Sequence, residues 1–242
     1  MISEPFRPCI LVPTYDNPLT IAQVAHESAA YLHDVLIVDD GSAEPARRVI
    51  DALAARGVAR VRRCDRNRGK GAAVAVGFAF ARELAFTHAL QIDGDGQHDL
   101  RCIPRVLAAA AANPQALILG YPTFDGSVPA LRRSARRITG FWVDVETGGH
   151  VIADPMTGFR VYPLAAAVMS GAAGRRMDFD IEIAVRMAWA GVPIVNLPVG
   201  VRYLSQQEGG VSHFRMIRDN AQISWLHTRL TIAAVRRRCI HT

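Results

Sequence analysis

The sequence predicts an α/β protein with a mostly parallel central sheet and helices on both faces of that sheet. Residues 8–13 and 35–38 form short, almost wholly apolar runs, as expected of parallel strands that are covered on both sides. Helix patterns alternate with the strand patterns, which implies right-handed crossover connections. The polar clusters of the first half follow strand runs, and open α/β sheets bind ligands along that edge.

The remaining elements follow in order along the chain. The segment 18–32 is a plausible helix, and a second helix starts near Pro45 and stops at Gly57. Further strands are expected at 58–63, 89–92 and 116–120, separated by an alanine-rich helix at 71–85 and a helix at 103–112. In the second half, strands at 157–162 and 194–203 flank a helix near 181–190, capped by Asp178 or Asp180.

Composition restricts the class of protein. The 242 residues, of which 50 % are hydrophobic, suit one large domain. No apolar run approaches the roughly 18 to 20 residues of a membrane span, and the first residues lack the features of a signal peptide, so we expect a cytoplasmic protein. Four widely spaced cysteines indicate neither a disulfide framework nor a zinc site. The net charge of +6 comes without a nucleic-acid-binding motif, so an anionic substrate or membrane surface fits better.

A pair of aspartates follows the strand expected at 89–92. In an extended segment residues i and i+2 point the same way, so Asp93 and Asp95 can direct both carboxylates at one Mg²⁺ or Mn²⁺. Such an ion keeps open positions for water and substrate phosphates, and the spacing therefore suggests diphosphate chemistry. An ordinary Asp-Gly turn is the alternative.

The only lysine of the chain stands out. The chain has 28 basic side chains, and all except Lys70 are arginine. Lys70 lies in the segment Asn67-Arg-Gly-Lys-Gly71. A compact point charge at this place could reach a phosphate.

Several ordered motifs resemble those of family 2 glycosyltransferases, most closely the dolichyl- or polyprenyl-phosphate mannosyltransferase group. They are Val12-Pro-Thr-Tyr-Asp-Asn17, Ile37-Val-Asp-Asp-Gly-Ser42, Asn67-Arg-Gly-Lys-Gly71, Asp93-Gly-Asp-Gly-Gln97, Thr157-Gly-Phe-Arg160 and Phe179-Asp-Ile-Glu182. The resemblance implies the GT-A nucleotide-sugar-binding fold over residues 1–213.

The resemblance also implies roles for individual residues. Base and ribose of a nucleoside diphosphate sugar, of the UDP or GDP type, would lie against Pro13, Thr14, Tyr15, Asp16 and Asp40. The divalent cation would be held by Asp95, with Asp93 beside it and Gln97 as a further ligand. Lys70 and Arg202 are candidates for binding the diphosphate, as is His213, which stands where the family often has lysine.

The acceptor stays open at this point. Polyprenyl phosphate is the first choice, and it needs no strong base because its second pKa is roughly 6. The alternative is a hydroxyl of a glycolipid or saccharide, for which Asp180 and Glu182 are the candidate bases, with Asp154 behind them. Asp180 could instead be a helix cap and Glu182 a first-turn partner of the helix dipole. A non-catalytic nucleotide-binding module that docks at a membrane is the non-enzyme alternative.

Two segments bear on a lipid acceptor. From Pro129 onward, Leu131, Ala135, Ile138 and Trp142 share a helical stripe opposite Arg132, Arg133, Arg136 and Arg137. This stripe could lie in a membrane interface or pack on the sheet. Residues 214–242 form a basic and partly amphipathic tail, with Arg215, Arg218, Arg229 and Arg236 opposite Met216, Ile223, Leu230 and Ala234. We expect peripheral contact with the cytoplasmic membrane face or a solvated tail.

Overall fold

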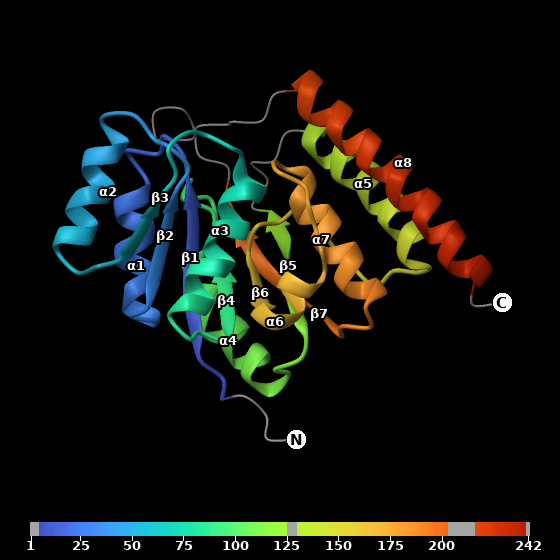
Figure 1. Ribbon diagram of the computed structural model, residues 1–242, viewed down its shortest axis with the longest axis horizontal. Helices are drawn as coiled ribbons and strands as arrows, with labels where there is room; N and C mark the ends of the chain where they lie inside the picture. Colours follow the sequence, from blue (N-terminus) through green and yellow to red (C-terminus); the bar gives the residue numbers. More distant parts are fainter. Residues whose placement is uncertain (1–4, 125–129, 203–215, 241–242) are drawn as a thin grey trace.

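The structure, a computed structural model, describes residues 5–124, 130–202 and 216–240 (Figure 1). Its strands are β1 (Pro8–Thr14), β2 (Val35–Asp39), β3 (Arg60–Arg63), β4 (His88–Gln91), β5 (Leu117–Phe124), β6 (Arg160–Pro163) and β7 (Ile194–Val201). Its helices are α1 (Ile21–Tyr31), α2 (Ala46–Ala55), α3 (Lys70–Glu83), α4 (Ile103–Ala112), α5 (Ala130–Thr147), α6 (Leu164–Met169), α7 (Asp178–Trp189) and α8 (Met216–Ile240), with a short 3₁₀ helix at Leu100–Cys102.

The strands form a seven-stranded sheet in the order β3-β2-β1-β4-β6-β5-β7. β3, β2, β1 and β4 pair in parallel, as do β5 and β7, so the predicted mostly parallel sheet is confirmed. Only β6 among these strands runs antiparallel, between β4 and β5, and it pairs Gln91 with Arg160. Because of this direction, the residues that precede β6 lie where β4 ends, next to Asp93.

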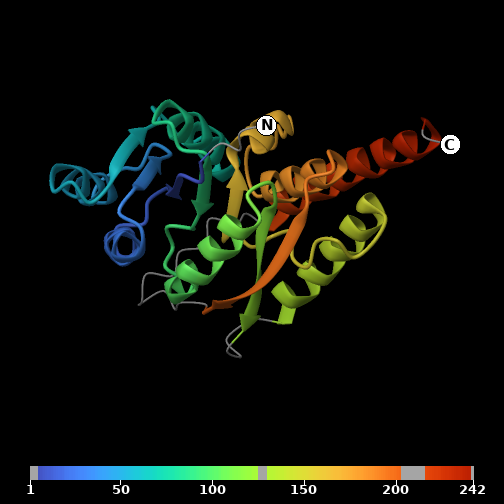
Figure 2. The same ribbon diagram turned by 90° about the horizontal axis from the view of Figure 1, so that it is seen from below.

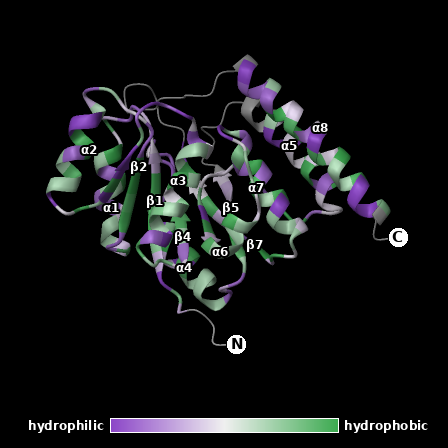
Figure 3. Cartoon of the chain, in the orientation of Figure 1, coloured by the Kyte–Doolittle hydropathy of each residue, from purple (hydrophilic) through white to green (hydrophobic). Residues whose placement is uncertain are grey.

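Helices cover both faces of the sheet, as predicted. The period of two along β1 sends Ile10 and Val12 towards the side of α1, α2 and α4, and Cys9 and Leu11 towards the side of α3, α6 and α7. Figure 2 shows these layers edge-on. The apolar colours of Figure 3 concentrate in the strands.

The last helix belongs to the same core. α5 and α8 run side by side and pack on α7 (Figure 1). Ile223, Leu226 and Leu230 of α8 are buried together with Val143 of α5 and Ile183 of α7. Ile223, Leu230 and Ala234 of the predicted apolar side of the tail are therefore buried, and Arg218, Arg229 and Arg236 are exposed as expected. The side chains of Arg215 and Met216 lie outside the described ones.

The apolar stripe predicted on α5 does not pack as one of its two interpretations expected. Ile138 is 62 % exposed and Trp142 is 39 % exposed, so this part of the stripe does not pack on the sheet. Thr139 and Val143 are buried instead, and Arg136, expected on the polar side, turns inward to an ion pair with Asp154. The side chains of residues 131–133 lie outside the described ones.

Candidate active site

A cavity of about 1200 Å³ opens at the carboxyl ends of β1, β2 and β4 and continues between α5 and α8. Most residues predicted to bind the donor or the cation line it, namely Pro13, Thr14, Tyr15, Asp40, Lys70, Asp93, Asp95 and Gln97. Asp16 does not line it, because its carboxylate accepts a hydrogen bond from the Ala43 amide at 2.8 Å. Arg202 follows β7 and is exposed, and His213 lies outside the described residues.

The cavity floor under the predicted nucleotide site is fixed by Asp40. Its carboxylate accepts hydrogen bonds from the backbone amides of Arg68 and Gly69, the latter at 2.7 Å. Burial raises the pKa of Asp40 above its usual value, more than these two amides lower it. Gly69 has a φ of +100°, and a Cβ there would lie 2.5 Å from the Arg175 carbonyl oxygen. The turn into α3 therefore requires glycine.

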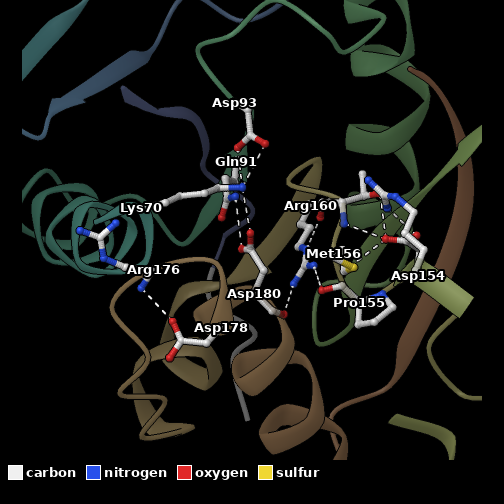
Figure 4. A network of polar contacts seen from close by, with 12 residues as sticks. Lys70, Gln91, Asp93, Asp154, Pro155, Met156, Arg160, Arg176, Asp178 and Asp180 are labelled. Atoms are coloured by element: carbon white, nitrogen blue, oxygen red, sulfur yellow. Dashed lines mark hydrogen bonds and ion pairs between the residues drawn. The ribbon is translucent and has the colours of Figure 1, made fainter. Parts of the chain in front are cut away.

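Lys70 connects the strand-end carboxylates to α7. Its Nζ lies 2.8 Å from an oxygen of Asp93 and 2.8 Å from an oxygen of Asp180, and Figure 4 shows it between the two. Burial acts to lower the pKa of Lys70, but the charges of Asp180 and Asp93 outweigh it, and the pKa is raised. In the structure Lys70 therefore neutralises the buried carboxylate of Asp180 and the partly buried one of Asp93, whereas the sequence suggested direct contact with a phosphate.

The two aspartates of the predicted cation site differ in their titration. Burial acts to raise the pKa of Asp93, but the charge of Lys70 outweighs it and the pKa is lowered. Burial and then the negative charge of Asp93 raise the pKa of Asp95. A buried carboxylate beside a like charge is stabilised by a cation, so the pair fits a divalent ion.

Space and ligand number fit the same ion. A Cβ at Gly158 would lie 2.4 Å from both carboxylate oxygens of Asp93, so only glycine leaves them accessible. Within the described ranges, no three His, Cys, Asp or Glu side chains cluster around a metal position. Asp93, Asp95 and the Gln97 amide thus make an incomplete set, and Mg²⁺ or Mn²⁺ bound there would take further ligands from water and a diphosphate.

The loop before β6 is held by two arginines. Arg160 is fully buried and donates hydrogen bonds to the backbone carbonyls of Pro155, Thr157 and Asp180 (Figure 4). Asp154 accepts from Arg136 at 2.6 Å and from the amides of Met156 and Thr157. These bonds place Gly158 against Asp93.

The three candidate bases do not line the cavity, and their carboxylates have partners. Asp180 contacts Lys70, and Asp154 is bound as described above. Glu182 accepts from the amides of Ala173 and Gly174 and pairs with Arg186. Glu182 thereby fixes the loop between α6 and α7.

That loop carries a cavity residue missed by the sequence analysis. Arg176 lines the cavity near Asp40, whose pKa its charge lowers, and the structure describes no acidic side chain paired with its guanidinium. No sequence pattern marks Arg176 as a site residue, because arginine is common throughout this chain. Arg136, predicted on the polar side of an amphipathic helix, lines the cavity wall as well.

The α8 wall of the cavity was also missed. Residues of α8 that line the cavity include Asn220, Ser224, His227, Thr228 and Thr231. A helical projection could have found this polar stripe, which lies between the apolar and arginine-bearing sides of the helix.

Known proteins resemble the chain at the level of sequence and fold. The family model "Glycosyl transferase family 2" matches residues 9–183. A polyprenol monophosphomannose synthase of Mycolicibacterium smegmatis is 26 % identical over 219 residues, covering 85 % of this chain and 80 % of that protein. An undecaprenyl-phosphate mannosyltransferase of Micrococcus luteus is 26 % identical over 206 residues, with 80 % and 82 % covered.

A solved structure shows the same fold. The glucosyl-3-phosphoglycerate synthase of Mycobacterium tuberculosis, crystallised with Mn²⁺ and UDP-glucose, superposes with a TM-score of 0.67 at 15 % identity, over 96 % of this chain and 79 % of that one. The fold is that of GT-A glycosyltransferases, as the sequence motifs implied. With a family model that matches most of its length, the chain belongs to glycosyltransferase family 2.

Proposed function

We propose that the chain transfers a hexosyl group from a nucleoside diphosphate sugar to a membrane-associated lipid acceptor, with polyprenyl phosphate as the first acceptor to test. The observation that carries this proposal is that one continuous cavity joins the Asp93–Asp95 pair to a groove between α5 and α8. The two mannosyltransferase relatives named above support the choice of acceptor by their names.

The donor end of the cavity would work by binding and charge neutralisation. Asp95, Asp93 and Gln97 would hold Mg²⁺ or Mn²⁺, which supplies compensation for the charge that develops on the leaving diphosphate. Lys70 keeps the Asp93 carboxylate ionised and in place. Asp40 would shape the floor under the nucleotide. Direct displacement at the anomeric carbon would invert the configuration of that carbon.

The state of the candidate bases supports a phosphate acceptor. A phosphate monoester is mostly dianionic at pH 7, since its second pKa is about 6, so it attacks without a base. A hydroxyl acceptor needs one, and Asp180, Glu182 or Asp154 would each have to leave an ion pair to serve.

The outer faces of α5 and α8 support contact with the cytoplasmic membrane face. Exposed apolar side chains that do not line the cavity lie on both helices and are Phe141, Trp225 and Val235. Exposed arginines accompany them on the same two helices, namely Arg137, Arg218, Arg229 and Arg236. Mixed apolar and basic surface of this kind suits anionic lipid headgroups. In the described part of the chain, no helix is both long and apolar enough to span a bilayer.

The test is the release of nucleoside diphosphate from a panel of UDP- and GDP-sugars with Mn²⁺, with and without polyprenyl phosphate. We expect the lipid to stimulate release from one donor, and Asp95→Asn to abolish the stimulated rate. Release that ignores the lipid but responds to a glycolipid or saccharide would favour the hydroxyl acceptor, which the polar α8 wall suits. Binding of nucleotide without turnover of any donor would favour the non-catalytic alternative.

A further inference from the structure

The wall that α8 contributes to the cavity is mostly polar, with Ile223 and Ile232 as its apolar members. One carboxylate, one amide, one imidazole and three hydroxyls line it, those of Asp219, Asn220, His227, Ser224, Thr228 and Thr231. The arginine side chains that the structure describes on α8 do not reach the cavity. Hydroxyl, amide and imidazole groups of this kind form hydrogen bonds with the hydroxyl groups of an uncharged polar ligand.

His227 is held in one orientation by a buried carboxylate. Its Nδ1 lies 2.8 Å from Oε1 of Glu146 on α5, and both residues are buried. Burial raises the pKa of Glu146, and the hydrogen bond with His227 opposes that rise. Since a carboxylate oxygen accepts, Nδ1 donates in this pair, and Nε2 is the nitrogen left for another partner.

Nε2 of His227 has no hydrogen-bond partner among the described residues and is shielded from bulk solvent. A buried polar atom without a partner lowers stability, so such an atom in a cavity wall indicates a ligand that supplies the missing bond. The indole of Trp142 lies close by, with its ring centroid 6.5 Å from that of the imidazole and the planes 31° apart. Trp142 also lines the cavity and offers an apolar surface there.

We propose that this wall binds the hydroxyl groups of a sugar ring, with Nε2 of His227 as a hydrogen-bond partner and Trp142 as an apolar platform. The proposal rests on the proposed function, in that the cavity is taken as the place where donor and acceptor meet. Two rings have this chemistry, namely the hexosyl group that is transferred and a saccharide carried by an acceptor. His227 would then help to determine which sugar the protein accepts.

The first arm of the test compares nucleotide with nucleotide sugar. In His227→Asn, the shorter amide can still donate to Glu146, but nothing replaces Nε2. Calorimetric titration in the presence of Mn²⁺ compares the affinity for UDP with that for UDP-glucose, and the affinity for GDP with that for GDP-mannose. If the transferred hexosyl is the ligand, the variant loses about fivefold in affinity for the preferred nucleotide sugar, the size of one hydrogen bond, and nothing for the nucleotide alone.

The second arm uses octyl β-D-glucoside below its micellar concentration, with tetraethylene glycol monooctyl ether as a probe of equal chain length without a sugar ring. If an acceptor saccharide is the ligand, the wild-type protein prefers the glucoside and His227→Asn loses that preference. His33→Asn makes the same change at an exposed histidine outside the cavity and should alter neither arm. Thermal melting checks that the variants fold.

Unchanged affinities in both arms would overturn the proposal. An equal loss for nucleotide and nucleotide sugar, with no change towards the glucoside, would also overturn it, because His227 would then act on the site as a whole. Failure of the proposed function is a separate result, since it appears as absent stimulation by polyprenyl phosphate whatever these affinities are.

Discussion

The side chains around Lys70 show what single residues contribute to the site. The sequence singled out Lys70 because it is the only lysine, and the Asp93–Asp95 spacing indicated a cation. Lys70, Asp93 and Asp95 all line the cavity. The ion pair from Lys70 to Asp180, however, joins residues 110 positions apart, which no local pattern reveals. The sequence left open whether Asp180 and Glu182 act as bases or as structural residues, and the structure describes Glu182 bound to the amides of Ala173 and Gly174 and to Arg186.

Replacing Lys70 by methionine should destabilise the protein in a pH-dependent way. The lowered pKa of Asp93 stabilises the wild-type fold above the ordinary aspartate pKa, and this contribution is lost as pH falls through the folded value. Without the ammonium group, burial raises the pKa of Asp93 instead, so the variant loses stability as pH rises. Urea unfolding should therefore show a larger deficit for Lys70→Met at pH 7.5 than at pH 4.5. An equal deficit at both values would contradict this account.

Arg176→Ala should weaken binding of the nucleoside diphosphate. Its guanidinium lines the cavity near Asp40, and a charge-assisted hydrogen bond to phosphate is worth about 1.5–3 kcal/mol, or at least tenfold in affinity. Arg175→Ala is the matched control, because Arg175 is the exposed neighbour of Arg176 and does not line the cavity. Titration with UDP and GDP would measure the difference, and equal affinities for the two variants would exclude this role.

At the scale of elements, the alternation of strands and helices over residues 8–124 could be predicted closely, because strands and helices differ in the periodicity of their apolar residues. The direction of β6 could not, because parallel and antiparallel strands of four residues look alike in sequence. α5 shows another limit. Its amphipathic pattern predicted the helix, but which side faces the protein depends on Asp154, the partner that draws Arg136 inward.

Arg137→Glu combined with Arg236→Glu should weaken binding to anionic vesicles. Both arginines are exposed on the helix pair, and each charge near an anionic leaflet contributes about 1 kcal/mol. Sedimentation with vesicles that contain phosphatidylglycerol would measure the loss. Arg47→Glu with Arg48→Glu changes the charge equally on α2 and should leave binding as it is. If both double variants sediment alike, the α5–α8 face is not the membrane contact.

At the scale of the whole molecule, α8 joins the tail predicted at 214–242 to the core of the preceding domain. Composition indicated one large core, but the sequence could not show that Ile223, Leu226 and Leu230 complete it, because a stripe of apolar residues is equally typical of a membrane-surface helix. The cavity depends on this packing, since α8 forms one of its walls.

Leu230→Ala should lower the free energy of unfolding by about 2–4 kcal/mol, because Leu230 is buried in the shared core. Denaturation followed by circular dichroism and by tryptophan fluorescence should give one common transition. Ile232→Ala, at an exposed position two residues further along α8, is the control and should cost much less. A separate early transition for α8 would show that the helix unfolds on its own.

The single lysine gives the site a built-in spectroscopic reporter. Reductive methylation with ¹³C-formaldehyde can label two kinds of amine, the chain terminus and the ε-amine of Lys70. The methyl resonance of Lys70 would sense the carboxylates of Asp93 and Asp180 directly, so that arrival of a cation or a nucleotide sugar becomes visible at one signal. Because the Lys70 amine reacts slowly while both ion pairs are formed, its rate of methylation would also measure how often the ion pairs break.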